Sequence, residues 1–118
     1  MPNAIDYTEI AVDDLERAKA FYAKALGWAF NDYGPDYAGI KDPDKPDQEF
    51  GGLSPHTPSS RGDGVVSLIR TANADEVLAN VLAAGGRVTT QMHDYPGGRR
   101  FMFADPWGNT LGVYEPSE

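Results

Sequence analysis

Residues 103–116 read FADPWGNTLGVYEP, a strand-like run that breaks at Asp105, turns over Gly108 and Asn109, and then resumes. Aromatic and β-branched residues on either side of Pro, Gly and Asn are typical of two antiparallel strands joined by a short loop. The returning strand carries one carboxylate, Glu115. The segment therefore predicts a hairpin, and it raises the question whether Glu115 serves a metal or ligand site.

Two segments upstream of this hairpin have apolar residues at helical spacing. In the first, Asp13 with Glu16 resembles a capping box, Gly27 marks the end, and the apolar stripe consists of Leu15, Ala18, Phe21, Tyr22, Ala25 and Leu26. In the second, Asn73 with Glu76 forms the cap pair, Gly85-Gly86 marks the end, and the stripe consists of Ala74, Val77, Leu78, Val81 and Leu82. The pattern predicts two amphipathic helices.

Each helix is preceded by one strand-like run and followed by three. The expected strands are 4–12, 28–33, 37–41 and 49–54 around the first helix, and 64–70, 87–91, 99–104 and 110–115 around the second. Both halves thus have the order β-α-β-β-β, and an offset of 59 residues brings Asp14 onto Asn73. We expect one domain over 1–118, with module 1 at about 1–54, a connection rich in Pro, Ser and Gly at 54–64, and module 2 at about 64–118.

The predicted fold class is α+β, with paired modules that form an open, curved, barrel-like sheet. A sheet covered by a helix on one face only, with apolar residues on both faces, needs cover for its second face. Two such sheets can curve around a shared cavity, which is then the default ligand site.

The composition limits the classes of partner that the protein is expected to bind. Eighteen acidic and ten basic residues among 118 give a formal charge of −8, which disfavours nucleic acid and anionic membranes. The absence of cysteine excludes disulfides and thiolate metal sites. Residues 1–10 lack a signal-peptide pattern and no apolar run could span a bilayer, so we expect a cytoplasmic protein.

Three stretches resemble the vicinal oxygen chelate superfamily, which includes glyoxalase I, bleomycin-resistance proteins and extradiol dioxygenases. They are EIAVDDLERAKAFYAKALGW at 9–28, LAAGGRV at 82–88, and FADPWGNTLGVYEP at 103–116. The resemblance implies paired β-α-β-β-β modules, commonly assembled as a homodimer. In the metal-dependent members it also implies a divalent ion held by His, Glu and sometimes Gln from the first and last strands of each module.

The positions that match those ligands do not supply a complete set. Tyr7 stands at the first position and Val66 or Ser67 at its counterpart in the second module, while the strand closing module 1 reads Gly52-Leu53-Ser54. Of the four expected ligand positions, only the last holds a usual metal ligand, Glu115. Since one carboxylate cannot hold a divalent ion, we expect no metal and no other cofactor unless the strand register differs. His56 and His93 are predicted to be polar loop residues.

The sequence leaves two functions open. The first is binding of a small molecule in an aromatic, acidic cavity lined by Tyr7, Trp28, Phe50, Phe101, Phe103 and Glu115, as the bleomycin-resistance branch implies. The alternative is a metal-dependent lyase or isomerase of the glyoxalase I type, with Glu115 as ligand or catalytic base. Glu115 itself either faces the pocket or pairs with Arg99 or Arg100 on the neighbouring strand.

Overall fold

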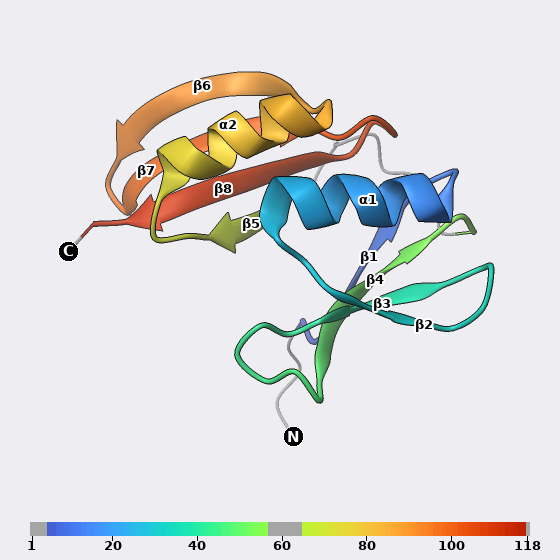
Figure 1. The fold of residues 1–118 in the computed structure, drawn as a ribbon. Helices are drawn as coiled ribbons and strands as arrows, with labels where there is room; N and C mark the ends of the chain where they lie inside the picture. The colour runs from blue at the N-terminus through green and yellow to red at the C-terminus, as the bar shows by residue number, and fades with distance from the viewer. Residues whose placement is uncertain (1–4, 57–64, 118) are drawn as a thin grey trace. The chain divides into compact units, whose positions relative to one another are not determined.

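The computed structural model describes residues 5–56 and 65–117. Within them the chain forms eight strands and two helices in two β-α-β-β-β modules, which confirms the predicted α+β class (Figure 1). The chain divides into two compact units, Met1–Ala23 with Gly27–Ser59 and Lys24–Leu26 with Ser60–Glu118. Most of the expected connection at 54–64 lies outside the described residues. No helix in the described part of the chain is long and apolar enough to cross a membrane.

Unit 1 contains a four-stranded mixed sheet in the order β1-β4-β3-β2. Its elements are β1 (Thr8–Ala11), α1 (Leu15–Leu26, whose last three residues group with unit 2), β2 (Phe30–Asp32), β3 (Ala38–Lys41) and β4 (Glu49–Ser54). β1 and β4 run parallel, and the other neighbours are antiparallel. The sheet is shorter than expected at its first strand, which begins at Thr8 rather than at residue 4.

The observed N-cap of α1 differs from the predicted one, whereas its C-cap is the predicted residue. Asp14, not Asp13, is the N-cap: its backbone is extended and its carboxylate accepts a hydrogen bond of 3.1 Å from the Arg17 N–H. Arg17 is the third residue of the helix, and the side chain of an N-cap residue typically accepts from the N–H of the second or third helical residue. Gly27 ends the helix in the left-handed region at φ 73°, as predicted.

The register of the unit 1 sheet gives its two faces different characters. Four residues stand side by side across the strands on one face: Asn31, Gly39, Gly52 and Glu9. The rows beside it point to the other face, because side chains alternate along a strand. Those rows hold the buried apolar residues Ile10, Ala38, Ile40 and Leu53. The first face is therefore polar, and the second forms the apolar core.

Unit 2 has the same topology, in the order β5-β8-β7-β6. Its elements are β5 (Ser67–Arg70), α2 (Ala74–Ala84), β6 (Arg87–Tyr95), β7 (Gly98–Ala104) and β8 (Thr110–Pro116). β6 continues four residues past the expected end at 91, because its pairing with β7 persists to the Tyr95–Gly98 closure. His93 consequently lies in a strand opposite Arg100, and the prediction that it lies in a loop is wrong.

The loop at 105–109 joins β7 and β8, as predicted. Asp105 organises it: one carboxylate oxygen accepts hydrogen bonds from the N–H groups of Trp107 (2.9 Å) and Asn109 (2.8 Å). The other oxygen accepts one from the Asn109 side chain at 2.7 Å. Asp105 and Asn109 are both buried, so the loop is closed by a satisfied polar network rather than by solvent.

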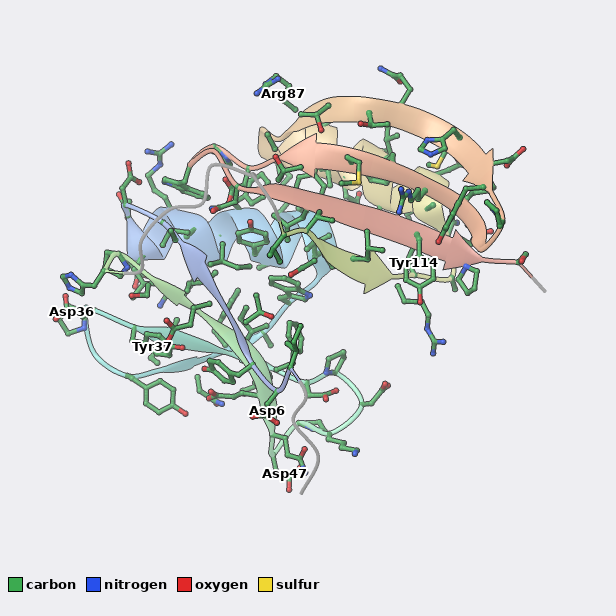
Figure 2. All side chains as sticks on the ribbon, turned by 180° about the vertical axis from the view of Figure 1, so that it is seen from behind. Asp6, Asp36, Tyr37, Asp47, Arg87 and Tyr114 are labelled. Atoms are coloured by element: carbon green, nitrogen blue, oxygen red, sulfur yellow. The ribbon has the colours of Figure 1, made fainter. Side chains whose placement is uncertain are left out.

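The two faces of the unit 2 sheet are assigned by their contacts with α2. Arg99 and Glu115, directly opposite each other on β7 and β8, both bond to the first turn of α2. Strand alternation then puts the buried residues Phe101, Phe103, Leu111 and Val113 on the same, helix-covered face. Arg100, Met102, Gly112 and Tyr114 project from the opposite face. Figure 2 views the sheet from that side, with Tyr114 standing out from β8.

Candidate functional site

Six side chains form a continuous hydrogen-bonded group on the polar face of the unit 1 sheet, here called the Glu49 cluster. Glu49 is its centre: one oxygen accepts from the Tyr7 hydroxyl at 3.1 Å, and the other from Asn31 Nδ2 at 2.9 Å and the Tyr33 hydroxyl at 2.5 Å. The Tyr37 hydroxyl lies 2.9 Å from that of Tyr7 and 3.0 Å from Glu9 Oε2. The cluster comprises Tyr7, Glu9, Asn31, Tyr33, Tyr37 and Glu49.

A β-bulge aims Glu49 at this face. Gly51 lies opposite Ile40 but Glu49 lies opposite Lys41, so Phe50 is an extra residue in β4. Without the bulge, strict alternation would place Glu49 on the apolar face with Gly51 and Leu53. The extra residue reverses that orientation, and the carboxylate reaches Asn31 on β2.

Two glycines provide the space for the cluster. A Cβ at Gly39 would collide with the Glu49 carboxylate, and a Cβ at Gly52 would collide with the Tyr37 ring and hydroxyl. Both glycines belong to the row that also holds Asn31 and Glu9. The side chains of Glu49 and Tyr37 therefore lie flat across the sheet, over backbone that has no side chain to displace them. Tyr37 itself enters from the segment between β2 and β3 (Figure 2).

The hydrogen bonds fix the charge state of the cluster. The Tyr33 hydroxyl, followed by Asn31, holds the pKa of Glu49 below its ordinary value. Burial, then the hydrogen bonds to Tyr7 and Glu9, raise the pKa of Tyr37, and burial is also the main cause of the raised pKa of Tyr7. The hydrogen bond to Glu49 raises the pKa of Tyr33. At neutral pH Glu49 is thus ionised and the phenols are protonated donors.

This arrangement suits an organic ligand better than a metal ion. In residues 5–56 and 65–117, no three His, Asp or Glu side chains lie close enough together to hold a metal. The Glu49 carboxylate is already engaged by two phenols and an amide, and no imidazole joins the cluster. Divalent transition metals in proteins favour several converging imidazole or carboxylate ligands. The cluster instead presents the ionised Glu49, the Glu9 carboxyl group and phenol oxygens, which accept hydrogen bonds and attract cations.

The two histidines lie apart from the cluster. His56 Nε2 is 3.5 Å from Asp36 Oδ1, and both side chains are largely exposed. His93 Nδ1 is 2.9 Å from the carbonyl oxygen of Gln91 in its own strand.

Of the residues predicted to bind a ligand, Tyr7 belongs to the cluster. Trp28 and Phe50 lie elsewhere in unit 1: the Trp28 ring stacks on Tyr22 at 5.0 Å and meets Phe50 edge-on at 5.2 Å. Both contacts are typical of aromatic packing that ties a helix to a sheet. A contact of Trp28 or Phe50 with a ligand stays a prediction.

Phe101 and Phe103 are wholly buried on the helix-covered face of unit 2, with ring centroids 6.3 Å apart. The sequence alone does not say which face of β7 the helix covers. Their observed role is packing beneath α2, and ligand contact by either ring stays a prediction.

Glu115 also faces α2. Its Oε1 accepts a hydrogen bond of 2.8 Å from the Ala74 N–H at the start of the helix. Arg99 is its cross-strand neighbour, as one of the two interpretations had it, but the Arg99 guanidinium binds Asp75 through two hydrogen bonds of 3.1 and 3.2 Å. Glu115 also borders a shallow depression of about 330 Å³ near the β6–β7 turn. The Glu115 carboxylate thus caps the first N–H of α2. A catalytic role for Glu115 stays a prediction.

The sequence interpretation missed Glu9, Asn31, Tyr33 and Glu49. Their signal was present but faint: Gly39 and Gly52 interrupt two adjacent strands, as glycines do where another group must approach the backbone closely. The bulge at Phe50 could not be recognised without the register.

Three comparisons with known proteins bear on the chain. The family model of the Glyoxalase/Bleomycin resistance protein/Dioxygenase superfamily matches residues 4–113. The anthracycline biosynthesis protein DauV of Streptomyces sp. (strain C5) is 29% identical to it, and the match covers the whole chain but 43% of DauV. This chain therefore spans less than half of that relative.

Among solved structures, TnmS3, described as an antibiotic binding protein from Streptomyces sp. CB03234, is 26% identical, with a TM-score of 0.69 and 98% of each chain covered. Protein ATC0852 from Agrobacterium tumefaciens is also 26% identical, with a TM-score of 0.79, 99% of this chain and 100% of that chain covered. The repeated β-α-β-β-β modules and the family match agree: this chain belongs to the Glyoxalase/Bleomycin resistance protein/Dioxygenase superfamily.

Proposed function

We propose that the protein binds a small organic molecule on the polar face of the unit 1 sheet, through the Glu49 cluster and without a metal or other cofactor. One observation carries the proposal: the ionised Glu49 is held by the phenols of Tyr7 and Tyr33 and the amide of Asn31. These groups give the carboxylate a fixed orientation. The site is built to accept hydrogen bonds from a ligand.

The chemistry of the cluster favours a ligand that combines a protonated amine with an aromatic surface. Glu9 and Glu49 offer negative charge, and the chain as a whole carries −8. The side chains of Tyr7 and Tyr33 are partly exposed, at 37% and 58%, so their rings are accessible for contact. A carboxylate beside exposed aromatic rings is a common arrangement for recognising organic cations.

The relatives support a small organic ligand. TnmS3 is described as binding an antibiotic, and DauV belongs to the biosynthesis of anthracyclines, which are polycyclic aromatic compounds. A homodimer and a cytoplasmic location, both expected from the sequence, stay predictions and are part of this proposal.

A matched pair of ligands tests the proposal. An anthracycline that carries an amino sugar and its aglycone, which lacks the amine, are titrated against the protein by calorimetry. We expect the amine-bearing compound to bind at least about tenfold more tightly, since a charge-assisted hydrogen bond contributes roughly 1.5–3 kcal/mol. Glu49→Gln and Glu9→Gln should remove that preference.

The control variant is Asp47→Asn, which removes one negative charge from the exposed tip of the β3–β4 loop (Figure 2). It should leave the preference for the amine intact. Equal binding of the two compounds, or equal weakening by Asp47→Asn and Glu49→Gln, would count against the cluster as the site.

The alternative function is tested separately. The purified protein is analysed for bound metals and assayed with the hemithioacetal of methylglyoxal and glutathione. A stoichiometric divalent metal together with turnover would replace the binding proposal by a metal-dependent lyase or isomerase.

A further inference from the structure

Unit 2 carries a second group of polar and aromatic side chains, on the sheet face opposite α2. Arg100 lies directly between His93 on β6 and Tyr114 on β8, and Arg70 on β5 lies opposite Tyr114. Tyr95, two residues after His93, shares the same face by strand alternation. We call these five residues the Arg100 face. Its two arginines give it a charge opposite to that of the Glu49 cluster.

Arg100 is held in place but is not neutralised. Its guanidinium carbon lies 4.8 Å from the centre of the Tyr95 ring, in a cation–π contact. Its Nε is buried, and among the described residues it has no hydrogen-bond partner. An N–H removed from water without a partner costs free energy. Such a group is uncommon in a folded protein and requires an explanation.

Two carboxylates of unit 2 serve the face of the sheet opposite to Arg100. Arg99, the preceding residue on β7, forms two hydrogen bonds with Asp75, and Glu115 bonds to the Ala74 N–H. Both acids lie on the α2 side because strand alternation sends Arg99 and Glu115 to the face away from Arg100. No ion pair of Arg100 is found within residues 5–56 and 65–117.

We propose that the Arg100 face binds an aromatic carboxylate, with Arg100 as the group that recognises the anion. The planar guanidinium can present the N–H groups of its two Nη atoms to the two oxygens of a carboxylate. Tyr95 fixes the plane of the guanidinium from one side. Tyr114, directly opposite Arg100 on β8, supplies a ring beside which the aromatic part of the ligand packs. Arg70 adds positive charge at the edge of this face.

This proposal does not depend on the function of the Glu49 cluster. All of its residues belong to unit 2, and its ligand has the opposite charge. The test is therefore specific: a simple aromatic anion should bind here whether or not an organic cation binds in unit 1.

The experiment follows the Nε–H resonance of Arg100 by ¹H–¹⁵N NMR during titration with benzoate and, in parallel, with benzyl alcohol. We expect benzoate to shift this resonance and those of Tyr95 and Tyr114 saturably, and benzyl alcohol to bind at least about tenfold more weakly. Arg100→Gln should weaken benzoate binding by at least about tenfold. Arg87→Gln, which removes an exposed arginine at the start of β6, should change it less than twofold (Figure 2).

A second variant, Arg100→Lys, keeps the positive charge but not the planar fork, and its amide spectrum reports whether the fold is retained. It should bind benzoate clearly less tightly than the wild type. Benzoate affinities that are equal in the wild type, Arg100→Gln and Arg100→Lys would overturn the proposal. So would a free-protein Arg100 resonance that moves with protein concentration, since the missing partner would then be a second copy of the chain.

Discussion

The carboxylate of Glu115, near the end of β8, accepts a hydrogen bond of 2.8 Å from the main-chain N–H of Ala74, the first residue of α2. The first N–H groups of a helix have no partner within the helix. Asn73 satisfies another of them by accepting from the Glu76 N–H at 3.1 Å. The last strand of unit 2 thus anchors the start of its helix, and the negative charge lies at the positive end of the helix dipole.

Replacing Glu115 by Ala should lower the stability of unit 2 by about 1 kcal/mol, the usual effect of losing a helix-capping acceptor. Chemical denaturation followed by circular dichroism measures the loss. Asp94→Ala is the matched control, because Asp94 is an exposed acid on β6 with only a 4.0 Å contact to Arg99. Equal effects of the two substitutions would show that the Ala74 hydrogen bond does not stabilise the helix start.

Gly52→Ala should disrupt the Glu49 cluster, because a Cβ there collides with the ring and hydroxyl of Tyr37. We expect a loss of about 1–3 kcal/mol, as for other side chains forced into occupied space. The measurement is a double-mutant cycle with Tyr37→Ala, which removes the obstructing ring. The two substitutions should be strongly non-additive, with the second relieving much of the loss caused by the first. Additive effects would mean that Gly52 is required for some reason other than Tyr37.

Asp105→Ala should destabilise the β7–β8 hairpin by about 2–3 kcal/mol, since it removes the acceptor of the buried Asn109 N–H, the part-buried Trp107 N–H and the Asn109 side-chain amide. Hydrogen exchange of the Trp107 and Asn109 amides should accelerate with it. Asp42 offers the control: it is a loop carboxylate that accepts one N–H, from Asp44 at 2.9 Å, at an exposed position. A loss as small in Asp105→Ala as in Asp42→Ala would contradict the role given to the buried network.

Helix ends and most strands could be predicted because their signals are local. Asn73, Gly27 and Gly85 cap helices through contacts within a few residues. The same reasoning missed Asp14 by one position, since two adjacent aspartates offer equivalent caps and only the backbone conformation distinguishes them. β6 is longer than predicted because its last residues are held by pairing with β7 rather than by their own β propensity.

The site resisted prediction because it depends on register. Glu49 reaches the polar face through a bulge, and Glu115 faces α2 rather than the opposite side. In a strand, a shift of one residue reverses every side chain, so the identity of a residue near an expected position says little about where it points. Tyr7 stands at the first ligand position of the family pattern. It is the one residue predicted to bind a ligand that lies in the Glu49 cluster.

The acid titration of Glu49 gives the last prediction. Three hydrogen bonds, that from Tyr33 above all, hold its pKa below the ordinary value of 4.5 in the folded protein. A carboxyl with a lowered folded-state pKa contributes stability that is fully present above the unfolded-state value and is lost as the pH falls through the folded-state value. The advantage of the wild type over Glu49→Gln, about 1 kcal/mol at pH 7, should therefore shrink below about pH 4.5. Tyr33→Phe removes the strongest donor, so it should move the Glu49 titration, followed by carboxyl ¹³C NMR, towards 4.5. A Glu49 that titrates at or above that value in the wild type would show that the phenols do not hold its charge.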